Sequence, residues 1–485
     1  MAENGKIRIL LPGPTSYLGR RLMLKLLDRP EVRLRVLVMD RTRLGDAAEA
    51  VPEIVEGDPL DPEVLQGATE GIDVAFYPLR FVGADEEFEE RRRVFPGVFR
   101  DACIRAGVQR IIFLGSFNRQ ATGSEPLKAS VDTGGVLSAF PDRIRTVWFR
   151  AGLIVGSSSL LFETLTNLAQ KMPVLPTPRW MEPRVTVIGI RDVLEYLIQA
   201  IHVPVDRSVE VEIGLEPRSF RDMLSETARI MGLRRVFLPL PIEAKRLSPV
   251  VLMLLSPFSI RLATLFLQLL DTVGKTNGGM STEKARRLFP EVSPAPFHVV
   301  VARAIDAIED REVISRWTDS IDTVSRSNAD EEISRSMFRD IRRESFGEIP
   351  PQEIFRAVKS IGGEHGWFRF DLLWRIRGLM DKLAGGFGDS LGRRTDSNLR
   401  VGDILDFWRV IDLRENRRLL LEAHMKVAGK AWLEFRIEGN TLVQTAYHYP
   451  KGLLGRLYWY SMLPFHAFIF PDMIRSIIRQ AGRMA

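Results

Sequence analysis

The chain has 485 residues, of which 45 % are hydrophobic and 27 % are charged, and its formal net charge is +6. That length suits two domains, and those fractions are typical of a soluble globular protein. The charge is modest and no long basic block occurs, so we expect no nucleic-acid partner. A single cysteine, Cys103, excludes an intrachain disulfide, and no secretory signal precedes the first predicted strand, so we expect a cytoplasmic protein.

Residues 7–21, IRILLPGPTSYLGRR, predict a strand, a tight turn and the start of a helix. In that order the turn lets the backbone approach a pyrophosphate. The helix N-terminus adds N–H groups and the positive end of its dipole. The candidate diphosphate contacts are the residues of this turn, namely Gly13, Thr15, Ser16, Tyr17, Leu18 and Gly19.

The spacing Gly13-x-x-Ser16-x-x-Gly19 resembles the GxxGxxG turn of the short-chain dehydrogenase/reductase superfamily, in its extended and atypical branches. The resemblance implies a bound NADP or NAD. Ser16 replaces the middle glycine, which in dinucleotide folds allows close backbone approach to the diphosphate. Its hydroxyl could instead donate to a phosphate or cap the helix. The other interpretation is a turn that packs strand on helix and binds nothing.

Four further apolar runs, 34–39, 54–58, 72–77 and 109–114, predict strands that alternate with helices. This alternation indicates a parallel sheet of the Rossmann type, on which ligands bind at the carboxyl ends of the strands. Asp40, Arg41 and Arg43 follow the second strand. The aspartate would bind a ribose 2′-hydroxyl and an arginine a 2′-phosphate, so NAD and NADP both stay open; an ordinary polar loop is the alternative.

The resemblance also assigns residues to the rest of the cofactor and to catalysis. It implies that Asp58 lies beside the adenine, and that Pro78, Leu79 and Ser116 line the nicotinamide half. The superfamily's usual catalytic tyrosine, with a lysine four positions later, is incomplete: Lys128 is present, but no tyrosine lies between Tyr77 and Tyr196. Ser116 and Lys128 are therefore catalytic candidates without the usual proton donor. The alternative is a turn serine and a solvated lysine.

The segment from residue 150 to 180 strengthens the resemblance. Its Arg150-x-Gly-x-Ile-x-Gly156, Phe162-Glu163 and Pro178-Arg-Trp180 patterns closely resemble bacterial atypical reductases of the NmrA-like and complex-I-subunit-like kind. The resemblance implies that this region frames a substrate pocket. Several of those relatives bind the dinucleotide without a demonstrated reduction. Trp180 either lines the substrate side or packs a loop onto the core, and we favour the core.

The most apolar stretch, 247–272, is interrupted by Pro257 and Arg261, so each half is too short to span a bilayer. We expect a pair of buried helices, with peripheral membrane contact as the alternative. A helix over 297–312 closes the first domain. We predict a Rossmann domain with a small substrate-side subdomain over 1–315, a polar linker over 316–335, and a second domain over 336–485.

Residues 336–485 predict an α+β domain. Strands over 337–346, 408–413, 419–425, 431–437 and 442–449 accompany a helix over 350–361 and a final helix over 453–483, broken at Pro464 and Pro471. On residues 361–367, 372–374 and 463–470, this part resembles the domain of unknown function that follows such Rossmann units in bacteria, with a START-like, helix-grip fold. Such folds often enclose an apolar ligand, so a small-molecule or lipid-like ligand is one hypothesis. The other, which we favour, is that the aromatic residues form the core: Trp367, Trp374, Trp432, Tyr458, Trp459 and Phe468.

Two functional hypotheses follow. The first is an NAD(P)-dependent oxidoreductase of an apolar substrate that remains to be identified. The second is a non-catalytic dinucleotide-binding sensor or assembly factor, whose second domain holds a hydrophobic ligand or lipid. The six histidines show no metal-ligand spacing, so we expect no metal site.

Overall fold

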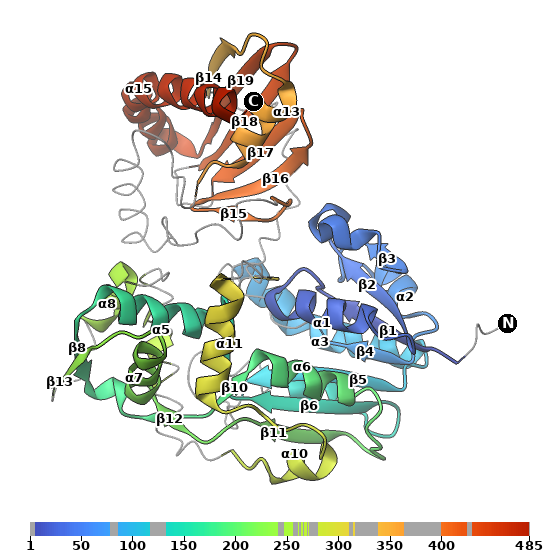
Figure 1. Cartoon of the computed structure of the whole chain (residues 1–485). Coiled ribbons are helices and arrows are strands. Elements are labelled where there is room, and N and C mark those ends of the chain that lie inside the picture. The colour runs from blue at the N-terminus through green and yellow to red at the C-terminus, as the bar shows by residue number, and fades with distance from the viewer. Residues whose placement is uncertain are drawn as a thin grey trace. The chain divides into compact units, whose positions relative to one another are not determined.

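The computed structural model describes residues 5–77, 86–116, 132–240, 247–255, 260, 263–264, 266–268, 270, 280–309, 314–315, 338–362, 399–423 and 429–484 (Figure 1). The chain forms two compact units. The first comprises residues 1–256 and 263–324, and the second comprises residues 325–485 with 257–262. The two units are described separately below.

Within the described part of the first unit, seven parallel strands form one sheet in the order β3-β2-β1-β4-β5-β6-β11. This order places the first strand in the middle, as in dinucleotide-binding folds. The predicted parallel sheet of the Rossmann type is therefore confirmed. The strands are β1 (Ile7–Pro12), β2 (Val32–Val38), β3 (Glu53–Glu56), β4 (Val74–Phe76), β5 (Arg110–Ser116), β6 (Arg145–Ala151) and β11 (Val209–Ile213).

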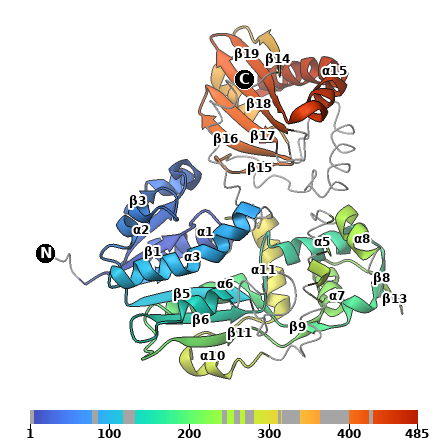
Figure 2. The ribbon, with the colours of Figure 1, turned by 180° about the vertical axis from the view of Figure 1, so that it is seen from behind.

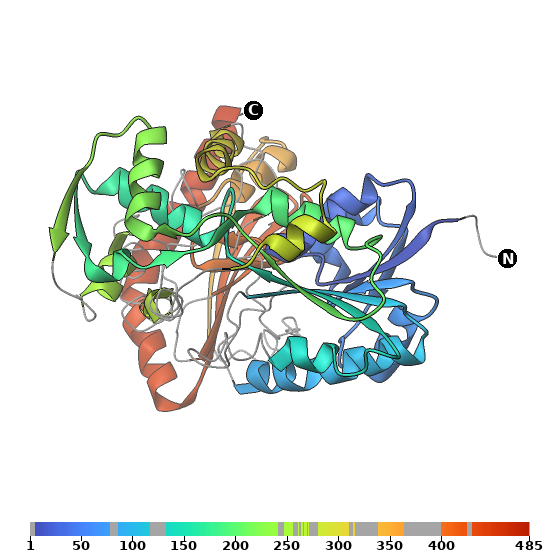
Figure 3. The ribbon, with the colours of Figure 1, turned by 90° about the horizontal axis from the view of Figure 1, so that it is seen from below.

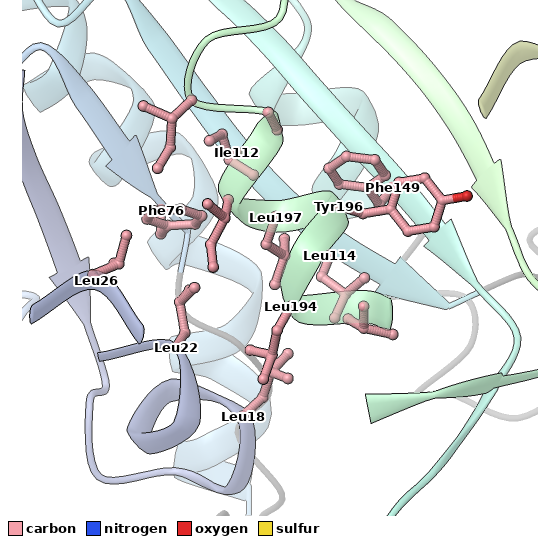
Figure 4. Packing of buried hydrophobic residues seen from close by; sticks show 14 of the residues in the cluster. Leu18, Leu22, Leu26, Phe76, Ile112, Leu114, Phe149, Leu194, Tyr196 and Leu197 are labelled. Carbon is pink, nitrogen blue, oxygen red and sulfur yellow. The ribbon is translucent and has the colours of Figure 1, made fainter. Parts of the chain in front are cut away.

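Helices cover both faces of this sheet, which Figure 3 shows between two helical layers. On one face, α1 (Tyr17–Leu27) and α6 (Ile190–Gln199) pack through leucines onto the strands, and Leu18, Leu22 and Leu197 lie in this core (Figure 4). On the other face, seen from behind in Figure 2, are α2 (Pro62–Thr69) and α3 (Glu86–Arg105). Cys103 of α3 is fully buried there, and this burial raises the pKa of its thiol well above the ordinary value.

The segment after β6 builds a smaller set of elements beside the sheet. They are β7 (Leu153–Val155), α5 (Leu160–Lys171), β8 (Val174–Pro178), η2 (Arg179–Met181), β9 (Arg184–Val185), β10 (Val187–Gly189), β12 (Arg218–Ser219), α7 (Phe220–Ile230), β13 (Val236–Leu240), α8 (Ser248–Leu255), α10 (Glu283–Leu288) and α11 (Phe297–Glu309). Trp180 is buried, packs on Phe220 and donates to Ser248 Oγ at 2.8 Å, which confirms the core interpretation. Helix α8 buries Leu252 but exposes Leu254, so only part of it is core.

The second unit contains an antiparallel sheet of six strands among its described residues, in the order β14-β19-β18-β17-β16-β15. Gly439 takes a φ of 58° in the predicted turn between the last two strands. The strands are β14 (Phe338–Ser345), β15 (Ile404–Leu405), β16 (Trp408–Arg414), β17 (Arg418–Ala423), β18 (Gly429–Glu438) and β19 (Thr441–Pro450). Helices α13 (Pro351–Lys359) and α15 (Gly452–Met484) bury their apolar residues against one face (Figure 1).

The predicted break in the final helix is wrong. α15 runs continuously from Gly452 to Met484 with Pro464 and Pro471 inside it. Each proline removes one helix hydrogen bond, but buried side chains on both sides of Pro471, such as Phe470 and Met473, hold the helix on the sheet.

The aromatic residues of this unit divide between core and surface. Trp432 and Trp459 are buried, as the core interpretation predicts, whereas Phe468 is 70 % exposed and contradicts it. Trp367 and Trp374 lie outside the described residues. Trp432 packs with Leu420 and Tyr447 in a cluster of its own, apart from the core beneath the helices.

Candidate functional site

The turn between β1 and α1 begins at Gly13, whose φ is +65°. Only glycine adopts this conformation readily, because a Cβ would strain the backbone. The Gly13 N–H donates to the Leu37 carbonyl on the neighbouring strand at 3.2 Å. The turn is therefore anchored to the carboxyl end of β2, where ligands of this fold bind.

Ser16 is the N-cap of α1. Its φ is −71°, a conformation open to any residue, so glycine is not required here on conformational grounds. Its hydroxyl accepts a hydrogen bond from the Gly19 N–H at 3.1 Å and donates to the Gly13 carbonyl at 3.0 Å. The side chain is thus held within the turn, and the helix-capping role considered for it is the one observed.

Gly19 lies where the helix passes closest to the turn. A Cβ at this position would come within 2.2 Å of the Gly13 carbonyl oxygen and 2.7 Å of Ser16 Oγ. Both contacts are shorter than atoms tolerate, so any side chain must displace the turn. The Ser16 cap and the absence of a side chain at Gly19 therefore let α1 pack directly against the turn.

Tyr17 and Leu18 point into the protein, so only their backbone groups remain as candidates for binding a diphosphate. Tyr17 is buried, which raises its pKa to about 12 in spite of nearby Arg21, and its hydroxyl donates to the Ser157 carbonyl at 3.1 Å. Arg21 donates to the same carbonyl at 3.1 Å and to Ser315 Oγ at 2.9 Å. This buried cluster, which sequence reasoning missed, joins the start of α1 to two distant loops; the serine run 157–159 was its only sequence signal.

The residues after β2 and β3 reach the same edge of the sheet as Gly13, because the strands are parallel. The Asp40 carboxylate caps η1 (Arg41–Ala48), accepting from Thr42 N at 2.9 Å and Thr42 Oγ1 at 2.6 Å. Arg41 is exposed and Arg43 is half-buried. Asp58 accepts from the Leu60 N–H at 2.9 Å and so shapes its own turn.

The other candidates are placed only in part. The backbone of Ser116 ends β5 and so reaches the same edge as Gly13, but its side chain is outside the described part of the structure. Pro78, Leu79 and Lys128 also lie outside the described residues. Thr15 is half-buried within the turn.

All three tyrosines of the first unit are buried. Tyr77 lies among the rings of Phe99 and Phe113, and Tyr17 is committed to the Ser157 carbonyl. Burial raises the pKa of Tyr196 to about 12, as does the nearby Asp192 carboxylate. A general acid needs to reach the substrate within hydrogen-bonding distance. None of the three occupies an exposed position from which it could replace the missing tyrosine of the superfamily.

Two family models match the chain. Residues 13–137 match a model described as NAD(P)H-binding, and residues 333–473 match a protein of unknown function, DUF2867. No curated protein is similar enough in sequence to count as a relative. Among the residues that the structure describes, no helix is both long enough and apolar enough to cross a bilayer, and no group of three or more His, Cys, Asp or Glu side chains is arranged to hold a metal.

Two solved structures that are similar to this chain cover 61 % and 62 % of it. A nucleoside-diphosphate-sugar epimerase from Staphylococcus aureus is 14 % identical, with a TM-score of 0.50 over 61 % of this chain and 100 % of its own. The Citrobacter sp. triphenylmethane reductase is 16 % identical, with a TM-score of 0.50 over 62 % of this chain and 99 % of its own, and it has been solved with NADP(H). At these identities the likeness concerns the fold alone. The N-terminal unit is an NAD(P)H-binding domain of the Rossmann type, and a DUF2867 domain follows it.

Proposed function

We propose that the protein is an NAD(P)H-dependent oxidoreductase in which the turn 13–19 holds the diphosphate of the cofactor. The capping position of Ser16 is the observation that carries this proposal. The Ser16 hydroxyl is hydrogen-bonded to Gly13 and Gly19. The side chain that replaces the middle glycine of the motif is therefore held within the turn. The first turn of α1 then presents its N–H groups and dipole toward the same strand ends.

For the adenosine half, we propose NADPH over NADH. The Asp40 carboxylate is engaged by Thr42, whereas Arg41 and Arg43 supply cationic groups where the fold accepts a 2′-phosphate. Asp58 would lie beside the adenine, and Pro78, Leu79 and Ser116 along the nicotinamide half. A bound nicotinamide would supply the hydride.

For the substrate, we propose an apolar, electron-poor acceptor such as a quinone or an aromatic carbonyl. The resemblance implies that residues 150–180 frame the substrate pocket, and the core beside them is apolar and aromatic: Trp180 packs on Phe220, and Phe220 packs on Phe266. With every tyrosine of the unit buried, Ser116 and Lys128 remain the candidates for holding the acceptor oxygen. An acceptor whose reduced form takes its proton from water would need no protein acid.

The test combines binding with turnover on the full chain. NADPH and NADH fluorescence are titrated first, and quinones and aromatic aldehydes are then added while absorbance at the nicotinamide band is followed. Saturable binding with acceptor-dependent oxidation, reduced in Ser116→Ala or Lys128→Ala, is the expected result. Absence of binding by either nicotinamide would overturn the proposal.

The burial of the three tyrosines favours a second candidate, a non-catalytic NAD(P)H sensor or assembly factor. In this version the second unit, with α15 lying along a six-stranded antiparallel sheet, acts as a helix-grip-like domain for a hydrophobic ligand or partner. Tight NADPH binding without oxidation by any acceptor would support this candidate over the enzyme.

A further inference from the structure

The first half of α15 exposes an apolar face. Leu453, Leu457, Tyr460 and Phe468 follow one another at helical spacing, flanked by Leu463 and Phe465, and all six are 37–72 % exposed. The edge of the Tyr460 ring also packs on Phe338 of β14, with 5.6 Å between the ring centroids. At 1.5 Å per residue, the stripe from Leu453 to Phe468 is about 22 Å long. The opposite side of the same helix buries Trp459, Ile469 and Phe470. This half of the helix is therefore apolar on both sides, which its packing against the described residues of the unit does not explain.

Within the segment that carries the stripe, the charged side chains are basic. No aspartate or glutamate occurs between Glu438 and Asp472 in the sequence. Lys451 and Arg456 are exposed at the start of the helix, and Arg475, Arg479 and Arg483 are exposed beyond the stripe. Arg475 pairs with Glu344 at 2.7 Å and Arg479 with Asp472 at 3.7 Å, so Lys451 and Arg456 are the cations considered below.

We propose that this surface, the apolar face of α15 with Lys451 and Arg456, rests on an anionic lipid bilayer. Leucine, phenylalanine and tyrosine side chains beside lysine and arginine are the composition of helices that lie in the membrane interface. The cations would meet lipid phosphates while Leu453, Leu457 and Phe468 enter the acyl boundary. A protein partner with a matching apolar groove would also cover the stripe, but the exposed cations Lys451 and Arg456, in a segment (439–471) without aspartate or glutamate, favour an anionic surface.

The experiment uses the full chain and two kinds of sucrose-loaded vesicle, pure phosphatidylcholine and phosphatidylcholine mixed with phosphatidylglycerol. We expect co-sedimentation with the mixed vesicles, weakened by added salt. The triple variant L453S/L457S/F468S should lower the partition coefficient roughly a hundredfold, because each side chain would otherwise bury apolar area. The variant K451E/R456E should lower it at least about tenfold on the anionic vesicles.

Two controls keep the result specific. V236S/L238S removes exposed apolar side chains from β13 in the other unit, and I341S removes one from β14 in the same unit; both should bind vesicles like the unchanged chain. If circular dichroism shows that the triple variant does not fold, the single variant L453S, at the most exposed position of the stripe, replaces it in the vesicle assay.

Three outcomes would overturn the proposal. They are binding to neither kind of vesicle, equal partition of the stripe variants and the unchanged chain, and vesicle binding lost only in V236S/L238S. A dimer seen by sedimentation velocity that L453S dissociates, without vesicle binding, would assign the stripe to a second copy of the chain instead.

Discussion

The two sheets of this protein place their polar groups differently. In the parallel sheet of the first unit, helices cover both faces, and the polar turn Gly13–Gly19 lies at the strand ends. In the antiparallel sheet of the second unit, α13 and α15 cover one face, and a buried charge cluster lies with Trp432 and Tyr447 away from that core. The first arrangement leaves backbone groups for a ligand, while in the second the buried Glu434 carboxylate is paired within the sheet.

The charge cluster centres on Glu434, whose side chain is 2 % exposed. It accepts from Arg418 Nε at 2.6 Å, from Arg436 at 2.9 Å and from the Tyr447 hydroxyl at 2.8 Å. Desolvation by burial acts to raise the pKa of Glu434, but the hydrogen bonds from Arg436 and Tyr447, with the charge of Arg418, outweigh it and lower the pKa. The cluster therefore stabilises the fold with its carboxylate ionised.

The largest effect is expected at Gly19. Gly19→Ala places a Cβ 2.2 Å from the Gly13 carbonyl, so the turn must open, and NADPH affinity should fall at least about a hundredfold. Gly67→Ala in α2 is the matched control, because beyond its own helix backbone and chain neighbours no described atom lies within 4 Å of the added Cβ, and it should bind normally. Fluorescence titration measures both. Equal affinities for the two variants would contradict a diphosphate site at this turn.

A large effect on stability is expected at Glu434. Glu434→Gln removes the buried counter-charge of Arg418, which then pairs only with Asp412 at 3.0 Å, and should destabilise the second unit by about 2 kcal/mol at pH 7. Glu438→Gln, exposed and 3.5 Å from Arg436, should change stability by less than about 0.5 kcal/mol. Denaturant unfolding measures both, and similar losses in the two variants would show that burial is not what matters.

The lowered pKa of Glu434 also predicts that the stability of the second unit depends on pH. Because the folded pKa of Glu434 lies below its ordinary value of 4.5, its contribution is complete above that value and is lost as the pH falls through the folded pKa. The stability difference between the unchanged chain and Glu434→Gln should therefore shrink below about pH 4.5. A difference that stays constant into acid would mean that the carboxylate is not ionised in the fold.

A smaller effect is expected at the adenosine end. The variant R41A/R43A should weaken NADPH about tenfold and NADH hardly at all, since only NADPH carries the 2′-phosphate. Arg105→Ala, an exposed position on α3, is the control. Calorimetry with both nicotinamides measures the ratio of affinities, and equal weakening of the two would remove the arginines from phosphate binding.

The smallest effect is expected at Tyr17. Tyr17→Phe loses one hydrogen bond to the Ser157 carbonyl, which Arg21 also bonds, so thermal unfolding should report a loss of about 1 kcal/mol in the first unit. Tyr460→Phe, on the exposed face of α15, should change nothing measurable. A loss of several kcal/mol at Tyr17 would mean that the cluster is more tightly coupled than its contacts indicate.

The sequence predicted those features that depend on neighbouring residues. Alternating strands and helices gave the parallel sheet, and the glycine spacing located the turn. The cluster of Arg21, Ser157 and Ser315 could not be predicted, because its members are up to 294 positions apart. The unbroken α15 was missed for a related reason: local rules predict breaks at Pro464 and Pro471, whereas the burial of Phe470 and Met473 against distant strands cannot be inferred from neighbouring residues. The catalytic roles of Ser116 and Lys128 remain predictions, because their side chains lie outside the described part of the structure.

One measurement addresses the central claim, that the turn accepts a dinucleotide with Ser16 in place. Calorimetric titration of NADPH into the unchanged chain and into Ser16→Gly compares the cap with the glycine of the related motif. Because the side chain is held inside the turn, and replacing a cap by glycine costs only a few tenths of a kcal/mol, we predict binding by both with dissociation constants within about threefold. Binding by Ser16→Gly alone, with no heat from the unchanged chain, would show that the hydroxymethyl group blocks the site.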